Sequence, residues 1–184
     1  MMHDDIEAVS PGLRRLCTLV RGGAAAGAFA AIAAQAWVWS SADVVSRVGP
    51  LMAGMACEGV NVDGRTRALG AAVSVVPTLL WLLLAQRLWA LFGLYGRGRA
   101  LTAEAQRLLQ QVGLVLLASA LVGPLYRAAL SVVLTLANPP GQRHLVLGLG
   151  GDDYLWALVS AALLAVATVM RQAVAAVDEN RSFV

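Results

Sequence analysis

The sequence predicts an all-α integral membrane protein, a four-helix bundle, and three observations lead to that fold class. The chain of 184 residues is 59% hydrophobic and only 14% charged, whereas soluble domains are about 45–50% apolar and about 25% charged. Its mean hydropathy is +0.70. The apolar residues also gather in runs of about 20, the length at which a helix crosses a bilayer. This composition excludes an ordinary soluble domain.

Four runs are expected to cross the membrane as one domain that comprises residues 1–184. The first starts directly after Arg21, and the fourth is closed by Arg171. The third has a readable beginning, because Thr102 is a good N-cap and Glu104 then lies in the first turn, where the helix dipole favours an anion. We expect the spans near residues 22–42, 68–92, 104–128 and 154–175. Residues 128–137 are predicted to project beyond the bilayer or to bend along its surface.

The distribution of arginine predicts the orientation, since basic connections stay in the cytoplasm. One side of the predicted topology carries eight of the 14 basic residues, all of which are arginine: Arg14, Arg15, Arg21, Arg97, Arg99, Arg107, Arg171 and Arg181. The other side carries Arg47, Arg65, Arg67 and Arg143. Both termini are therefore expected in the cytoplasm. Cys17 and Cys57 then lie on opposite sides, too far apart for a disulfide. This topology also explains the net charge of +3, so no direct binding of nucleic acid is expected.

The first span allows two alternatives. Its Ala34-Gln35-Ala36 triplet has the small-x-small pattern of a signal-peptidase site, but apolar residues continue to Trp39 and favour an uncleaved span. Gly23 and Gly27 begin a strip of small residues that brings helices close together. We expect this strip to pack within the chain, and a homo-oligomer contact is the alternative.

Few side chains within the spans carry chemistry. Gln35 is the one strongly hydrogen-bonding residue deep in a span, and we expect it to tie two helices together. Pro77 and Pro124 are each expected to bend a span. Arg127 is predicted near the outer headgroups, where its side chain reaches towards water.

The connections contain a weak metal candidate and no catalytic motif. Met52, Met55 and Cys57 have soft sulfur ligands of the kind that hold Cu(I), although an apolar patch is the favoured interpretation. The acidic pair Asp152-Asp153 either binds a cation weakly or complements the dipole at a helix start. None of the common phosphate-loop, zinc-protease or nucleophile-elbow motifs occurs. We therefore expect no cofactor and no enzymatic activity.

Two stretches resemble a bacterial four-span family, domain of unknown function 2975. One is the predicted cytoplasmic connection from Leu94 through Gly96, Thr102 and Glu104, similar to an aromatic-Gly-hydrophobic-Ser/Thr-x-Glu junction; Leu101 stands where that family often has phenylalanine. The other is the Asp178–Val184 ending, similar to an acidic-Glu-Asn motif that closes on a hydrophobic residue. The resemblance implies a multi-pass protein of the bacterial inner membrane. Some members are encoded beside a small helix-turn-helix regulator.

Two functions follow as hypotheses. The first is a regulatory protein that contacts a cytoplasmic partner, such as a transcription regulator, through the connection and the tail. Its candidate contact residues are Arg97, Arg99, Glu104, Arg107, Asp178, Glu179, Asn180 and Phe183. The alternative is a small transporter or channel subunit with a path along Gln35, Pro77 and Pro124, which requires a water-lined cavity that reaches mid-membrane.

Overall fold

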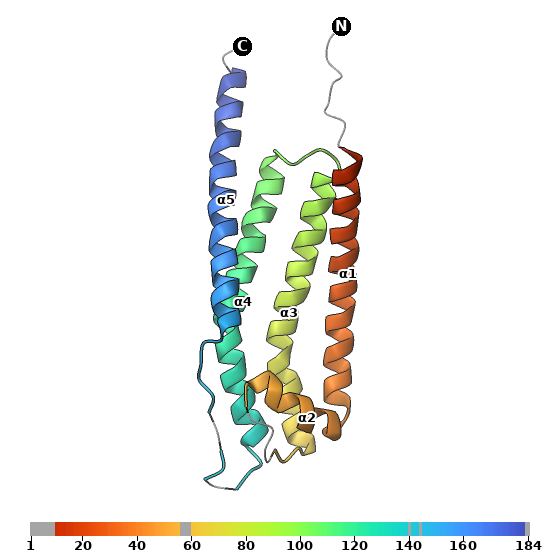
Figure 1. Cartoon of the computed structure of the whole chain (residues 1–184), viewed down its shortest axis with the longest axis vertical. Helices are drawn as coiled ribbons and strands as arrows, with labels where there is room; N and C mark the ends of the chain where they lie inside the picture. The colour runs from red at the N-terminus through yellow and green to blue at the C-terminus, as the bar shows by residue number, and fades with distance from the viewer. Residues whose placement is uncertain (1–9, 56–59, 140, 144, 183–184) are drawn as a thin grey trace.

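Five helices make up the described part of the chain in a computed structural model (Figure 1). The structure describes residues 10–55, 60–139, 141–143 and 145–182, with side chains up to residue 172. The helices are α1 (Pro11–Ser40), α2 (Ala42–Ala53), α3 (Gly64–Tyr95), α4 (Ala103–Thr135) and α5 (Gly151–Ser182). The four long helices are long and apolar enough to cross a membrane, so this is a multi-pass membrane protein.

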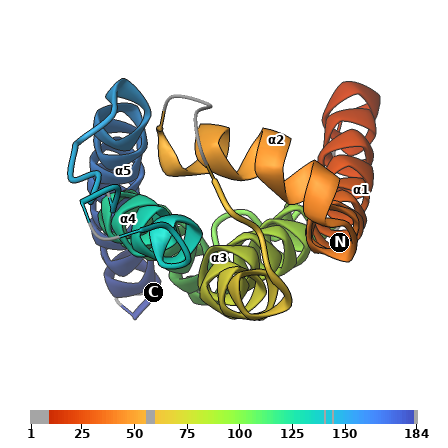
Figure 2. The same ribbon diagram turned by 90° about the horizontal axis from the view of Figure 1, so that it is seen from below.

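The long helices form a curved row in which the backbones pack closely only between neighbours along the row. α1 packs on α3, α3 on α4, and α4 on α5, while no described residue of α1 makes a backbone contact with α4 or α5. Figure 2 shows α2 lying across the concave side of this row. The start of α1, the connection between α3 and α4, and the end of α5 all lie at the same end of the molecule along the helix axes, here called the terminal end (Figure 1). The opposite end is called the α2 end.

Polar residues set the beginnings of the long helices. Ser10 accepts a hydrogen bond from the Leu13 N–H (3.3 Å), and Thr102 accepts one from the Ala105 N–H (3.3 Å). These caps satisfy N–H groups that have no partner within the helix. Asp63 does the same for α3, and hydrogen bonds from the Thr66 side chain and N–H lower the pKa of the Asp63 carboxyl. The prediction that Thr102 caps the third long helix is therefore confirmed, and this helix begins at Ala103.

Helix α2 was not predicted. A spanning helix needs about 20 apolar residues, whereas this segment is 12 residues long with a proline inside it. Its buried face consists of residues four apart, Val45, Gly49 and Ala53, which lie on one side of a helix. Gly54 ends it in the left-handed conformation (φ 69°), which glycine adopts without strain.

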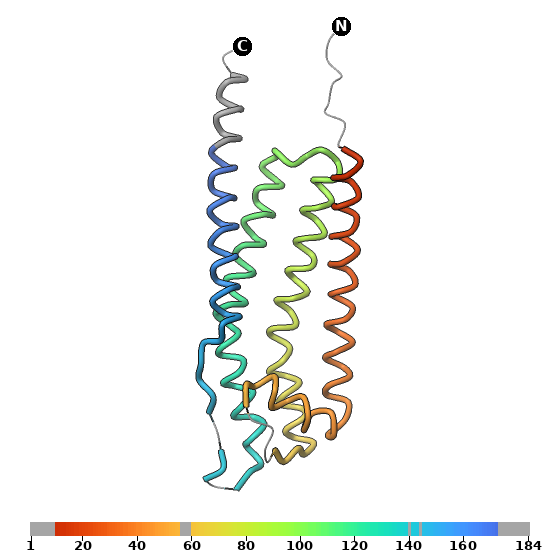
Figure 3. Tube along the Cα trace, viewed as in Figure 1, coloured from red at the N-terminus to blue at the C-terminus, as the bar shows by residue number. Residues whose placement is uncertain are grey.

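The last turns of α4 pack under α2. Leu130 and Leu134 are fully buried in a cluster with Val45 and Ala53 of α2 and Trp39 of α1. Residues 128–135 therefore continue α4 without a break, and one side of this segment is buried. The bend along the membrane surface that was one of two expectations does not occur. From Thr135 the chain turns back along the outside of the α2 end and enters α5 partway up α4 (Figure 3).

Arg67 closes the end of α1. Its guanidinium donates hydrogen bonds to the Trp39 carbonyl (2.8 Å and 3.2 Å) and to the carbonyl of Ser40. The last carbonyls of a helix lack partners within the helix and carry its negative dipole end, which a cation stabilises. The Trp39 ring lies directly over Gly70, where a Cβ atom would be 2.1 Å from the ring. α1 and α3 are thus fixed together at the α2 end.

Candidate functional site

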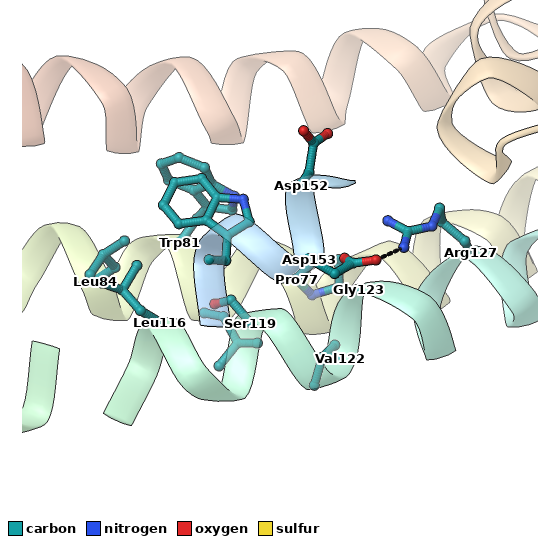
Figure 4. A pocket seen from close by; sticks show the side chains of 12 residues that line it. Pro77, Trp81, Leu84, Leu116, Ser119, Val122, Gly123, Arg127, Asp152 and Asp153 are labelled. Carbon is teal, nitrogen blue, oxygen red and sulfur yellow. Dashed lines mark hydrogen bonds and ion pairs between the residues drawn. The ribbon is translucent and has the colours of Figure 1, made fainter. Parts of the chain in front are cut away.

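A cavity of about 210 Å³ lies between α3, α4 and α5 (Figure 4). Its wall is polar at the start of α5 and apolar farther along the helices. The lining residues are Pro77, Leu80, Trp81, Leu84, Leu116, Ser119, Val122, Gly123, Arg127, Asp152, Asp153 and Trp156. It brings a buried ion pair next to an apolar wall within the spans, and we therefore describe it as the candidate site.

An ion pair between Arg127 and Asp153 forms the polar end of the cavity (Figure 4). The Asp153 side chain is only 7% exposed and that of Arg127 25%. The same Asp153 oxygen accepts the N–H of Gly150 at 2.7 Å, and the Arg127 guanidinium also reaches the Gly148 carbonyl at 3.4 Å. A buried carboxylate needs such partners because its desolvation is costly. Arg127, expected only to reach towards headgroups, therefore connects α4 to the start of α5.

Gly123 makes the ion pair sterically feasible. A Cβ atom at this position would lie 2.6 Å from Oδ1 of Asp153, closer than any real contact allows. The absence of a side chain lets the carboxylate approach the backbone of α4. In the sequence, Gly123 stands out only as the neighbour of Pro124. The pairing of Asp153 with Arg127 could not be predicted, because the two residues are 26 positions apart.

The deeper part of the cavity is apolar. Leu84 and Leu116 line it, and the Ser119 hydroxyl donates to the Val115 carbonyl within α4 at 2.9 Å. The rings of Trp81 and Trp156 meet edge to face with centroids 6.3 Å apart, which connects α3 with α5. A ligand here would meet charge at one end and hydrocarbon at the other.

A second cavity of about 280 Å³ shares Pro77 and Trp81 with the first and extends towards α1 and α2. Gln35 lines it and donates to the Ala71 carbonyl of α3 at 3.2 Å. The expectation that Gln35 ties two helices together is confirmed. Ser74 and Tyr126 hydrogen bond to each other across α3 and α4 at 3.1 Å.

The two prolines within spans lie in uninterrupted helices. α3 continues through Pro77, which lines both cavities, and α4 continues through Pro124, which is not among the residues of either cavity. The bend that each proline is expected to cause stays a prediction.

The small-residue strip of α1 is exposed. A Cβ atom at Gly23 or at Gly27 would contact nothing within 4 Å, and Ala26, Ala30 and Ala34 are exposed as well. The expectation that this strip packs within the chain is therefore wrong, because α1 contacts α3 through a different face. The homo-oligomer alternative stays a prediction.

The soft-ligand candidate is only partly described. Met52 and Met55 are partly buried against the apolar cluster of the α2 end, and Cys57 lies outside the described residues. Among the residues that the structure describes, no group of three or more histidine, cysteine, aspartate or glutamate side chains gathers to hold a metal ion. The packing of the two methionines supports the apolar-patch interpretation.

The predicted contact residues of the α3–α4 connection lie together at the terminal end. Arg97, Arg99, Glu104 and Arg107 are all exposed, and Arg99 pairs with Glu104 at 3.3 Å. α5 continues as a helix to Ser182. The side chains of Asp178, Glu179 and Asn180 lie outside the part that the structure describes, as does Phe183.

Two polar contacts between α4 and α5 were missed. The Gln106 amide donates to the Met170 carbonyl at 2.9 Å, and the buried Ser160 hydroxyl donates to the Gly113 carbonyl at 2.8 Å. Ser160 is the only hydroxyl residue between Tyr154 and Thr168 of α5, which is a signal that could have identified it as an interhelical contact. No such signal separates Gln106 from the nearby Gln110 and Gln111.

Comparisons of the chain with family models, curated proteins and solved structures found no match. The resemblance to domain of unknown function 2975 therefore stays a prediction based on the connection and the tail.

Proposed function

We propose that this chain is a regulatory protein of the bacterial inner membrane that acts by protein contacts at its terminal end and carries out no catalysis. Both termini lie in the cytoplasm in this proposal. One observation carries it: Arg97, Arg99, Glu104 and Arg107 are all exposed on one short connection between two spanning helices. Charges grouped outside the apolar spans form a surface that a soluble partner can recognise.

The connection has a defined backbone, which fixes the positions from which these charged side chains project. The N–H groups of Arg97 and Arg99 donate to the Leu94 carbonyl at 3.0 Å and 3.1 Å, and Thr102 caps α4. Gly98 has a φ of 74°, a conformation that glycine adopts without a steric penalty. A surface that is ordered before binding loses less conformational entropy when a partner binds.

The connection and the helix that bears the tail are linked. Gln106 in the second turn of α4 donates to the Met170 carbonyl of α5, which continues from there towards the tail. A partner that contacts Arg107 is therefore close to the helix that leads to Asp178 and Glu179. The family resemblance suggests what the partner is, because some members are encoded beside a helix-turn-helix regulator.

Truncation after Val177 tests the proposal. The shortened chain should still insert into the membrane, because all four spans remain, but it should no longer co-purify with the cytoplasmic partner of the intact chain. Asp178→Asn with Glu179→Gln should weaken recovery of that partner. The matched control, Asp4→Asn with Asp5→Asn, removes the same charge from the other terminus and should not. Unchanged recovery after truncation would refute the proposal.

A small transporter or channel subunit is the second candidate, and the cavity beside Arg127 and Asp153 favours it. Water in this cavity can be tested in a variant that lacks Cys17 and Cys57 and carries Ser119→Cys. A transport path predicts reaction with a membrane-impermeant thiol reagent. Leu121→Cys is the control, because Leu121 is 65% exposed on the outside of α4 and would face lipid. Failure of the Ser119→Cys variant to react would rule out a path through this cavity.

A further inference from the structure

A second charged cavity lies at the terminal end and shares Arg97 with the surface just proposed. It has a volume of about 270 Å³ and lies between the start of α1 and the end of α3. Arg14, Thr18 and Arg21 line it from α1, and Phe92 and Arg97 line it from α3 and the connection that follows. Three guanidinium groups thus line one small space, where their mutual repulsion favours a bound anion.

Arg21 is held in place without an anionic partner. Its guanidinium lies 4.3 Å from the centre of the Trp89 ring, a cation–π contact that fixes the plane of the group. Its Nε atom is buried and has no hydrogen-bond partner among the described residues. A buried donor without an acceptor costs free energy, and no described contact of Arg21 neutralises its charge.

The described residues that line the cavity include no carboxylate. The ion pairs within the described residues are Arg47–Asp43, Arg99–Glu104 and Arg127–Asp153, and none of them includes Arg14, Arg21 or Arg97. Asp4, Asp5 and Glu7 precede α1 and lie outside the described residues. The excess of positive charge therefore belongs to the cavity as the structure describes it.

We propose that this cavity binds the phosphate group of an anionic membrane phospholipid. Guanidinium groups bind phosphate oxygens through paired N–H donors. Basic cavities between spanning helices at the cytoplasmic surface are typical sites for phospholipid headgroups. The lipid source is favoured over a free phosphate ion by position, because Arg21 directly precedes the apolar run of α1 and Phe92 supplies an apolar wall.

The test compares two variants with the same loss of charge. The intact chain in a nonionic detergent is titrated with phosphatidylglycerol or phosphatidylcholine, and the bound lipid is counted by native mass spectrometry. Arg14→Gln with Arg21→Gln should weaken phosphatidylglycerol binding roughly tenfold or more. Arg15→Gln with Arg171→Gln removes two exposed arginines outside the cavity and should leave binding within about twofold of the intact chain. Helix content by circular dichroism verifies that both variants are folded.

Three results would overturn the proposal. Equal losses in the two variants would show general attraction of lipid to a basic surface. Equal affinity for phosphatidylcholine would show that the negative charge of the lipid is not recognised. Displacement of phosphatidylglycerol by millimolar inorganic phosphate would assign the cavity to a free anion. None of these variants alters Arg99, Arg107 or the tail, so failure here is distinguishable from failure of the proposed partner surface.

Discussion

The two ends of the molecule use the same type of interaction in different ways. Towards the α2 end, Arg127 pairs with the Asp153 carboxylate, whose side chain is 7% exposed. At the terminal end, Arg99 pairs with Glu104, and these side chains are 53% and 60% exposed. Water screens the second pair and is largely excluded from the first. The charges towards the α2 end therefore connect helices, whereas the charges at the terminal end are exposed to other molecules.

Breaking the buried pair should have the largest effect. Arg127→Met leaves Asp153 buried without its cation and should reduce the free energy of unfolding by about 3–5 kcal/mol. Urea or thermal unfolding in detergent measures the change. The double variant Arg127→Met with Asp153→Leu removes both charges and should be considerably more stable than the single variant. If both variants unfold alike, the pair does not hold α5 in place.

Filling the contact between α1 and α3 should have the next largest effect. Gly70→Ala puts a methyl group into the Trp39 ring, and the forced rearrangement should cost about 1–3 kcal/mol. Gly27→Ala is the control, because nothing lies within 4 Å of that position and alanine favours the helix. Equal melting temperatures for these two variants would contradict the packing described at the α2 end.

Removing the exposed pair should have the smallest effect on stability. Arg99→Gln should change the free energy of unfolding by only about 0–0.5 kcal/mol, since both partners are well hydrated. The same variant should still reduce recovery of the cytoplasmic partner. A loss of stability as large as that of Arg127→Met would show that the two ends do not differ in the way described.

The sequence predicted four long apolar helices, because length and apolar composition alone define them. It also predicted the start of α4 from Thr102, since capping is a local property. It did not predict α2, because the apolar face of this short helix is buried only by contact with the distant Leu130 and Leu134. The Arg127–Asp153 pair and the cap that Arg67 provides for α1 depend on how distant segments pack, which one sequence does not reveal.

The most direct test of the proposed function removes two arginines from either end and measures recovery of the cytoplasmic partner with the solubilised chain. Arg99→Gln with Arg107→Gln alters the terminal end, and Arg47→Gln with Arg65→Gln makes the same charge change near the α2 end, where both residues are exposed. A membrane-impermeant label verifies that topology is retained in both. We predict that only the terminal-end variant loses the partner. Full recovery with that variant, or loss with the α2-end variant instead, would contradict the proposal.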